Sequence, residues 1–409
     1  MNAGRQSVRL RAGFLLGCLL VQLSTSAPAH AYVFNRVVAD ARDIRNSPHM
    51  ACPAAQRFNT ATPGIVDRRW STSLGAVPQT IFTSQDAIPT LRLNEIEQSI
   101  LRAFSIWTNV AGATLRPASI GALMRTATQN ACSVSDGLNS ICLNQADPGF
   151  STGVLAFATT VSSDILTEQP FPLNPPAVFT GEILDADVYF NPSDPSATFA
   201  TPAVLPARPA SFDFESILTH ELGHFFGFSH SGVWRAMMFP FAPPPGEFLG
   251  DRPTMAVPDA PLSDDDRTGL RALYPDPADT VNTGSISGRI EPANPLTLTG
   301  QAGVTGIFGS HVVAVDDATG AVIGAALGGW SCTGAGPAQF DGGYLIERLP
   351  VGRSYRVYVE PFDTPLAPGN LVGATSALCR NATTDPGWPA QAACTVPIFS
   401  PAFVTRARE

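Results

Sequence analysis

The residues most able to do chemistry lie in one short stretch, HELGHFFGFSH, at residues 220–230, which holds three of the six histidines of the 409-residue chain. If this stretch is helical, His220 and His224 lie one turn apart on the same face, so that both imidazoles can bind one metal ion. Glu221 directly follows the first of them, and its carboxylate can reach the open side of that ion without binding it. An isolated HExxH pattern also occurs on solvated helix surfaces, so the residues after it decide the interpretation.

A third histidine turns this pattern into a predicted catalytic zinc site. Gly227 allows the chain to leave the helix through a backbone conformation that strains other residues, which returns His230 toward the same ion. Three histidines leave the fourth zinc position open, whereas structural sites fill all four positions. Zinc lowers the pKa of a bound water to about 7 and polarises a carbonyl group. We therefore expect peptide-bond hydrolysis by a metal-activated water, with Glu221 as the general base that passes the proton to the leaving amine.

Three segments are predicted to be helices that position this site. In LRLNEIEQSILRAFSIWTNV the apolar residues recur at spacings of three and four, which indicates an amphipathic helix packed on a sheet, with Asn94 as its N-cap. The histidine-bearing helix is SFDFESILTHELGHFFGF, with Ser211 or Asp213 as its N-cap. In LSDDDRTGLRALYP, Ser263 and Asp266 form a capping-box pattern that begins a short final helix.

Two segments ahead of the histidine-bearing helix are predicted strands, GVLAFATTV at residues 153–161 and ILDADVYFN at residues 183–191. In the second, apolar residues alternate with Asp185, Asp187 and Tyr189, as in a strand with one polar face. We expect this strand to be an exposed sheet edge, where an extended peptide can add as a further strand over the metal.

The stretch HELGHFFGFSHSGVWRAMMFP resembles the metzincin signature, in which a methionine turn follows the third histidine. It is most similar to that of the matrixins, the matrix metalloproteinase group, because Ser231 follows the last histidine and residues 236–240, AMMFP, match the turn. The resemblance covers roughly Asp67 to Pro275. It implies a zinc endopeptidase of the α+β class, with a twisted mixed sheet plus helices, and it places Met238 beneath the metal as the turn methionine.

The chain departs from matrixins where that family binds a second, structural zinc through histidines. Phe157 and Tyr189 stand at two of those places. We therefore expect one catalytic zinc; these replacements argue against a structural zinc, but the sequence does not decide whether a second zinc or calcium is bound. The loop after Met238 is longer than in the family, so the substrate preference of matrixins is not carried over.

The N-terminus has the features of a secretory signal peptide over residues 1–31. Arg5, Arg9 and Arg11 precede a short apolar run, and the small-residue site Ala29 to Ala31 follows it, as in cleaved signal sequences. We expect a protein that is secreted, or periplasmic or on the cell surface, after cleavage near Ala31, and no lipid anchor at Cys18. Residues 32–64 are interpreted as an N-terminal extension or short propeptide.

Six cysteines follow the signal peptide, and an even number in an exported protein favours disulfides. The two pairs that are close in sequence are suspected loop staples, Cys132 with Cys142 and Cys379 with Cys394. Cys52 and Cys332 are then paired across domains or free. Matrixin propeptides silence the zinc with a cysteine thiolate, so a latency switch at Cys52 stays open beside a disulfide.

The pattern changes after the predicted metalloprotease domain at residues 65–275 and a linker at residues 276–285. Residues 286–409 contain short alternating runs separated by Gly and Pro, which predicts a small all-β sandwich. Its motifs resemble carboxypeptidase regulatory-like, transthyretin-type domains, which accompany exported enzymes without doing chemistry. His311 lies in one of its predicted strands and is interpreted as a packed or solvated residue.

The composition is that of a globular protein, with 44% hydrophobic and 14% charged residues. A net charge of -9 argues against a nucleic-acid partner, and no segment after residue 31 predicts a transmembrane span. The main hypothesis is a secreted zinc-dependent endopeptidase that acts on protein or peptide substrates. The alternative is a surface adhesion or matrix-binding protein with a vestigial metal site. The sequence indicates no oligomeric state.

Overall fold

The computed structural model describes the chain in several stretches. These are residues 36–39, 64–71, 77–83, 90–122, 139–143, 153–162, 181–191, 198–248 without 232, 234, 235 and 240, 259–291 without 280, 310–328 and 343–361. The predicted signal peptide lies outside them, as do all the cysteines except Cys142. Among the described helices, none is both long and apolar enough to cross a bilayer.

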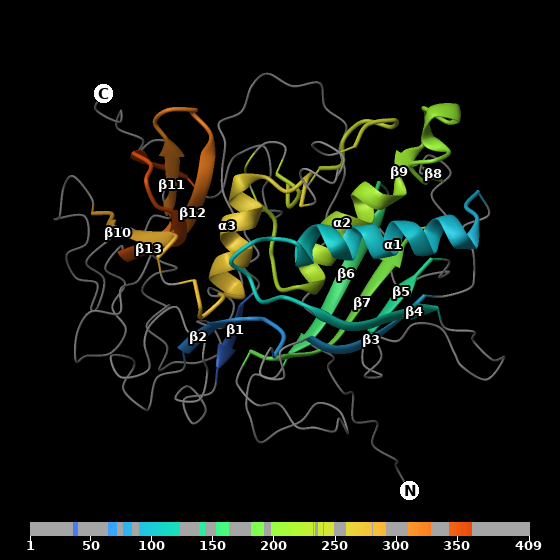
Figure 1. The fold of residues 1–409 in the computed structure, drawn as a ribbon, viewed down its shortest axis with the longest axis horizontal. Helices are drawn as coiled ribbons and strands as arrows, with labels where there is room; N and C mark the ends of the chain where they lie inside the picture. The colour runs from blue at the N-terminus through green and yellow to red at the C-terminus, as the bar shows by residue number, and fades with distance from the viewer. Residues whose placement is uncertain are drawn as a thin grey trace, which may run out of the picture.

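A five-stranded mixed sheet supports the site (Figure 1). Its strands run in the order β4 (Pro117–Ala122), β3 (Val77–Thr83), β5 (Asn139–Cys142), β7 (Ile183–Phe190) and β6 (Ala156–Ser162). The first four are parallel, and β6 pairs antiparallel with β7 at the edge. The prediction that residues 183–191 form the edge strand is therefore wrong. These residues form β7, which lies between β5 and β6, and β6 is the edge strand.

The polar residues of β7 explain this error. Asp185 and Asp187 are each 1% exposed, although their alternation with apolar residues predicts a solvent-facing side. The Asp187 carboxylate accepts hydrogen bonds from the Ser140 backbone N–H at 3.0 Å and from the Tyr189 hydroxyl at 3.2 Å. A buried carboxylate is tolerated where such donors satisfy it, so the Asp187 side chain bonds within the sheet and does not face solvent.

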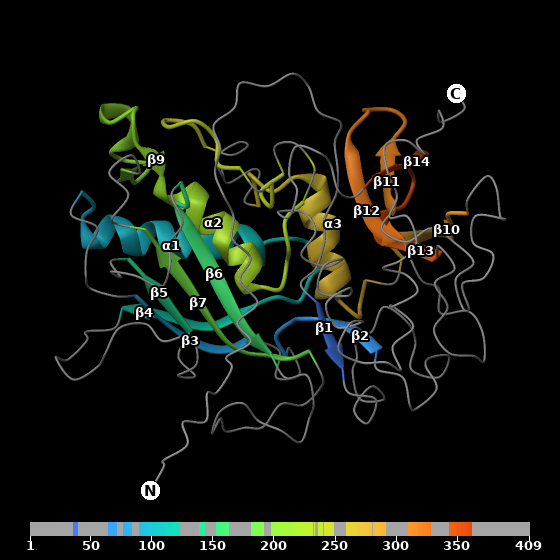
Figure 2. The same cartoon turned by 180° about the vertical axis from the view of Figure 1, so that it is seen from behind.

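Three helices complete this part of the fold: α1 (Leu93–Thr108), α2 (Phe214–Phe225) and α3 (Asp264–Leu273). Helix α1 packs along α2, and α2 lies against β6 and β7 (Figure 2). The Trp107 indole N–H donates to the Thr219 carbonyl of α2 at 2.9 Å. At the opposite end of the contact, Arg102 donates to the buried Glu215 carboxylate at 2.7 Å. The apolar core lies between these two helices and the sheet.

The helix starts follow from local hydrogen bonding. Asp213 caps α2 by accepting from the Ser216 N–H at 3.0 Å, and Ser263 with Asp266 forms the predicted capping box of α3. The prediction of Asn94 as the cap of α1 is wrong, because the helix already begins at Leu93. Its N-cap is Arg92, which makes no side-chain capping bond.

Short elements join the ends of this unit. Strand β1 (Arg36–Ala39), within the predicted N-terminal extension, pairs antiparallel with β2 (Gly64–Asp67). Between β7 and α2, β8 (Phe199–Ala200) pairs parallel with β9 (Phe212–Asp213), and the 3₁₀ turn η3 (Leu205–Ala207) lies between them.

All the described helices and strands after α3 are strands, which form two sheets. One sheet pairs β10 (Thr283–Arg289) with β13 (Gly343–Pro350), and the other has the order β12 (Val322–Gly328), β11 (Ser310–Asp316) and β14 (Tyr355–Pro361). Strand β10 begins within the segment predicted to be a linker. A shared apolar cluster packs the sheets together; its buried members are Val312, Ala314, Ile323, Ile346 and Leu349. His311 lies on β11 and is fully buried.

Candidate metal centre

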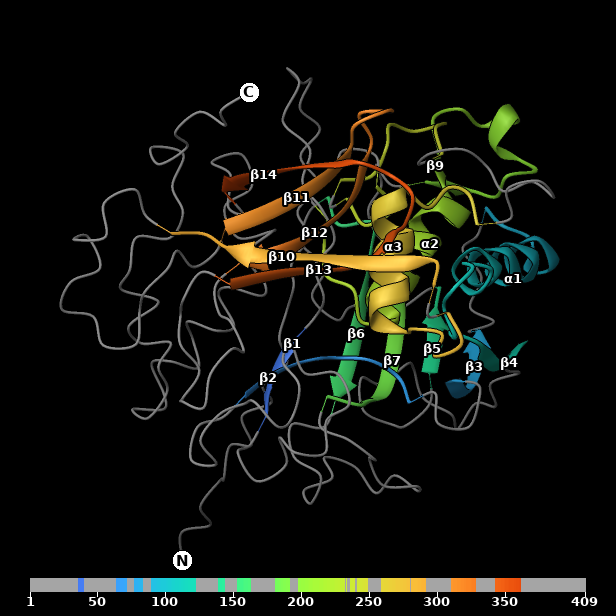
Figure 3. The same cartoon turned by 60° about the vertical axis from the view of Figure 1, so that its left-hand side comes forward.

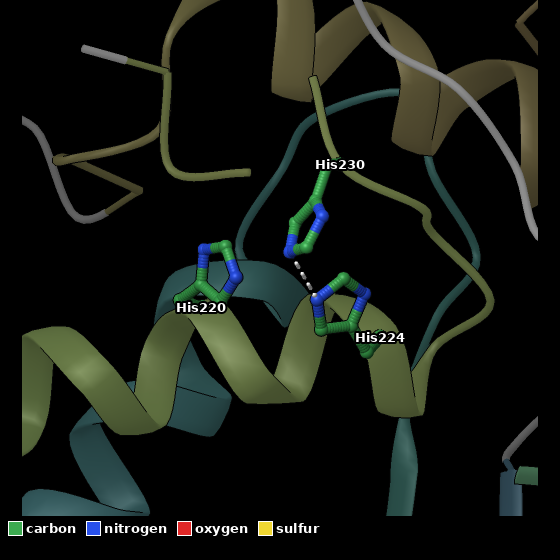
Figure 4. Close-up of side chains that lie close together, drawn as sticks. All are labelled: His220, His224 and His230. Atoms are coloured by element: carbon green, nitrogen blue, oxygen red, sulfur yellow. Dashed lines mark hydrogen bonds between the residues drawn. The ribbon is translucent and has the colours of Figure 1, made fainter. Parts of the chain in front are cut away.

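The three predicted ligands converge. The imidazoles of His220 and His224 on α2 and of His230 beyond it point toward one another (Figure 4), and their ligand atoms all lie within 4.8 Å of one another. The Nε2 atoms of His224 and His230 are 3.1 Å apart. Within the described stretches of the chain, no second group of this kind is found.

Backbone carbonyls fix the tautomers of two rings. The Nδ1 atom of His220 lies 2.6 Å from the Met237 oxygen, and that of His224 lies 2.9 Å from the Phe228 oxygen. A carbonyl only accepts hydrogen bonds, so each Nδ1 carries the proton and each Nε2 keeps a free lone pair. Burial lowers the pKa of His220 to about 3 and that of His224 to about 4. Both rings are therefore neutral at pH 7, the state that binds metal.

Glu221 lies beside the ligands and is 5% exposed. Burial raises its pKa to about 8, against the opposing effect of a hydrogen bond from the Ala158 backbone N–H. Its Oε2 atom is buried and has no hydrogen-bond partner among the described residues. A buried acceptor without a partner costs about 1–3 kcal/mol, so this oxygen fits a site completed by a bound group. Three converging imidazoles with an adjacent carboxylate form a donor set suited to one zinc ion.

The turn after α2 requires the glycine that the sequence places there. Gly227 has φ +103, and a Cβ at this position would overlap the Arg68 carbonyl oxygen. The Phe228 N–H donates to the Gly223 carbonyl at 2.9 Å, which closes the turn. The chain then reaches His230 on the same side as the two helical ligands, as the spacing predicts.

Side chains from distant parts of the chain hold the end of α2. The Tyr274 hydroxyl donates to the Phe226 carbonyl at 2.7 Å and accepts from the Trp70 backbone N–H at 3.1 Å. The Trp70 indole N–H donates to the Phe225 carbonyl at 2.9 Å. These bonds attach the turn that leads to the third ligand to the segment after β2 and to the C-terminal end of α3.

Met238 lies beneath α2 and is fully buried. A Cβ built on Gly223 would overlap its Sδ atom and lie 2.9 Å from its Cε atom, so the side chain packs directly on the helix between Glu221 and His224. The Met238 carbonyl accepts from the Ser231 N–H at 2.7 Å. The segment from residue 231 to residue 238, here called the ligand loop, is therefore closed on itself below the site.

Two aspartates of α3 hold the ligand loop, and the sequence analysis did not assign them this role. Asp266 accepts from the Met237 N–H at 2.8 Å in addition to its capping bonds with Ser263. Asp265 accepts from the Ser231 hydroxyl at 2.9 Å. The only signal in the sequence is the capping pattern, which predicts the bond of Asp266 to Ser263. It does not predict the bond of either aspartate to the ligand loop.

At the two places where matrixins carry zinc-binding histidines, the structure has an aromatic pair. Phe157 and Tyr189 are direct cross-strand partners, and their rings are stacked with centroids 5.0 Å apart. Cys142 on the neighbouring strand β5 is disulfide-bonded. Its predicted partner Cys132, like Cys379 and Cys394, lies outside the described residues, so both pairings stay predictions.

Two comparisons with known proteins agree with this geometry. Residues 164–275, which contain the three histidines, the ligand loop and α3, match the family model of the matrixins. Metalloendoproteinase 1 of Glycine max is 37% identical over 65 residues, which are 16% of this chain and 18% of the relative's own length. The fold, the site and these matches support a matrixin-like metalloprotease. The match to the relative covers only a small part of either protein, so its activity is not transferred as a whole.

Proposed function

We propose that the protein is a secreted, zinc-dependent endopeptidase in which His220, His224 and His230 bind the metal and Glu221 is the general base. The observation that carries this proposal is the buried Oε2 atom of Glu221, which has no partner among the described residues and lies beside three converging imidazoles. When bound, zinc supplies an activated water and polarises the scissile carbonyl.

Glu221 supplies the proton transfers of the reaction. Its carboxylate takes a proton from the attacking water and returns it to the leaving amine nitrogen. Its burial suits this task, because burial raises the pKa of the carboxyl group and so opposes the effect of the zinc charge, which keeps the group able both to accept and to release the proton. Backbone carbonyls hold His220 and His224 in one orientation while these transfers occur.

Strand β6 is the proposed substrate platform. No described strand pairs with its outer edge, and its Ala158 N–H reaches the Glu221 carboxylate. An extended peptide that adds to this edge as a further strand therefore brings its backbone past the general base. This arrangement favours unfolded or extended segments of protein substrates.

The remaining parts of the proposal follow from the sequence. Export after cleavage near Ala31, the disulfides Cys132–Cys142 and Cys379–Cys394, and a single zinc are proposed on the evidence of the signal-peptide pattern, the even cysteine count and the aromatic pair at Phe157 and Tyr189. An adhesion protein with a vestigial site is not favoured, because the three ligands and the carboxylate are all in place.

The test combines metal analysis with cleavage of unfolded protein and peptide libraries. Wild type and Glu221→Gln should each hold one zinc, whereas cleavage by the variant should fall about 100- to 10,000-fold. Glu247→Gln removes an exposed carboxylate and serves as the matched control with unchanged cleavage. Wild-type turnover in Glu221→Gln, or purified protein without zinc, would refute the proposal.

A further inference from the structure

The sheet formed by β12, β11 and β14 has two apolar faces. Along β11, Val312 and Ala314 face the β10–β13 sheet. Val313 and Val315 point the opposite way and pack in a separate cluster. An antiparallel sheet in an independent two-sheet domain usually presents polar residues on its outer side. The second apolar face therefore needs its own partner.

That partner is the ligand loop. Val233 and Ala236 of the loop pack against Val313, Val315 and Ala325 of the sheet. Ala236 and Val313 are fully buried, and Val233 is 7% exposed. The contact joins residues far apart in the sequence. Figure 3 shows α3, whose aspartates hold the ligand loop, next to the C-terminal strands.

The covered ligand loop is the part of the chain that positions two of the proposed metal ligands, His220 and His230. It begins one residue after His230, and its Met237 carbonyl orients the His220 ring at 2.6 Å. The Ala236 N–H donates to the Val233 carbonyl at 3.0 Å, so the two residues under the sheet form one tight turn just ahead of Met237. A shift of this turn moves the carbonyl that fixes the tautomer and direction of a ligand.

The sheets are also attached to the segment that follows α3. Arg348 of β13 donates to the Asp279 carbonyl at 3.1 Å, and the Val351 N–H donates to the Asn282 carbonyl at 3.0 Å. Helix α3 lies against β12 and β13. The aspartates of α3 thus hold the ligand loop by hydrogen bonds, and the C-terminal sheet covers it with apolar side chains.

We propose that the C-terminal sheet is a positioning element of the metal centre, in which Val313 and its neighbours hold the ligand loop in the geometry that binds zinc. This role differs from that of an accompanying module, which would leave the metal site unaffected. The inference rests on the proposed metal site and requires no particular substrate.

The chain offers a matched pair of variants for the test. Val312 and Val313 are adjacent on β11 and both fully buried, but they face opposite sides of the sheet. Val313→Ala and Val312→Ala remove the same atoms from the full-length protein. For each variant, we would measure the zinc dissociation constant by chelator competition, the visible spectrum of the cobalt-substituted protein, and the free energy of unfolding in urea.

Both variants should lose stability, but only Val313→Ala should weaken zinc binding, by about tenfold or more, as for residues that orient metal ligands. Its cobalt spectrum should also change. Val233→Ala, on the loop side of the contact, should reproduce this effect, and the double variant with Val313→Ala should weaken binding by less than the product of the two. If Val313→Ala folds poorly, Val233→Ala tests the same contact from the loop side.

Equal zinc affinity in the Val312→Ala and Val313→Ala proteins would overturn the inference, and so would additive effects in the double variant. These outcomes are distinct from failure of the proposed function. A wild-type protein that binds zinc with the expected pattern of variants but cleaves no peptide would refute the endopeptidase and leave the positioning role intact.

Discussion

Gly223 lies on α2 between the general base and the second ligand, at the point where the helix meets Met238. A Cβ at this position would overlap the Met238 Sδ atom and lie 2.9 Å from both Met238 Cε and Trp107 Cζ2. The Trp107 ring has little freedom, because its N–H donates to the Thr219 carbonyl at 2.9 Å. The strain from Gly223→Ala therefore falls on Met238 and the ligand loop.

Two opposing effects set the size of the change. Alanine in place of glycine stabilises an ordinary helix by about 1 kcal/mol, whereas overpacking a core costs about 1–3 kcal/mol. For Gly223→Ala, the difference is a net loss of up to about 2 kcal/mol. We would measure it as the free energy of unfolding in urea, followed by far-ultraviolet circular dichroism at constant zinc concentration.

A double-mutant cycle identifies the obstructing side chain. In a Met238→Ala background the contacts with Sδ and Cε are removed and only the 2.9 Å approach to Trp107 Cζ2 is left, so the same Gly223→Ala change should cost clearly less than in the wild-type protein. If Gly223→Ala stabilises the wild-type protein, or if its penalty is unchanged without the methionine, the assigned contact is not the cause and the reasoning fails.

Three further predictions concern the surroundings of the site. Tyr274→Phe leaves two buried backbone groups without a partner and should lower the free energy of unfolding by about 1–3 kcal/mol in urea titrations; an unchanged midpoint would contradict the bonds described. Both oxygens of Asp266 accept from backbone N–H groups of the ligand loop, so Asp266→Asn places an amide donor against the N–H of either Met237 or Met238; chelator competition should show weaker zinc binding, and wild-type affinity would refute this role. Because the pKa of Glu221 is about 8 without metal, the group is mostly protonated at pH 7, and the positive charge of zinc favours its carboxylate. Calorimetry in buffers of different ionisation heat should therefore show proton release at pH 7 that decreases above pH 8 and is smaller in Glu221→Gln; equal release in both proteins would contradict the burial of this carboxyl group.

The local parts of the site were predictable because their physics is local. The spacing of His220 and His224 sets one helix face, and Gly227 marks the turn that returns His230, so a short stretch of sequence contains most of the geometry. The caps at Asp213 and Ser263 were predictable for the same reason, since each bonds to a residue three positions away.

The parts that sequence reasoning missed depend on long-range pairing. Alternation along residues 183–191 predicts a solvent-facing side, but the Asp187 carboxylate is buried and accepts from β5. The sequence pattern therefore does not indicate that β6, and not β7, is the edge strand. Similarly, Asp265 is one of three consecutive aspartates, and only the fold places it against Ser231. The packing of Val313 on Val233 connects two predicted domains, which a reading that treats each domain separately does not anticipate.

Among the described residues, two tryptophans bond to α2 through their indole N–H groups, Trp107 at the Thr219 carbonyl and Trp70 at the Phe225 carbonyl. Indole emission depends on hydrogen bonding and on the polarity around the ring. The fluorescence of these two residues should therefore respond to changes in the ligand-bearing helix. Metal binding at this helix is therefore expected to change the tryptophan emission, which would follow metal loading without an attached dye.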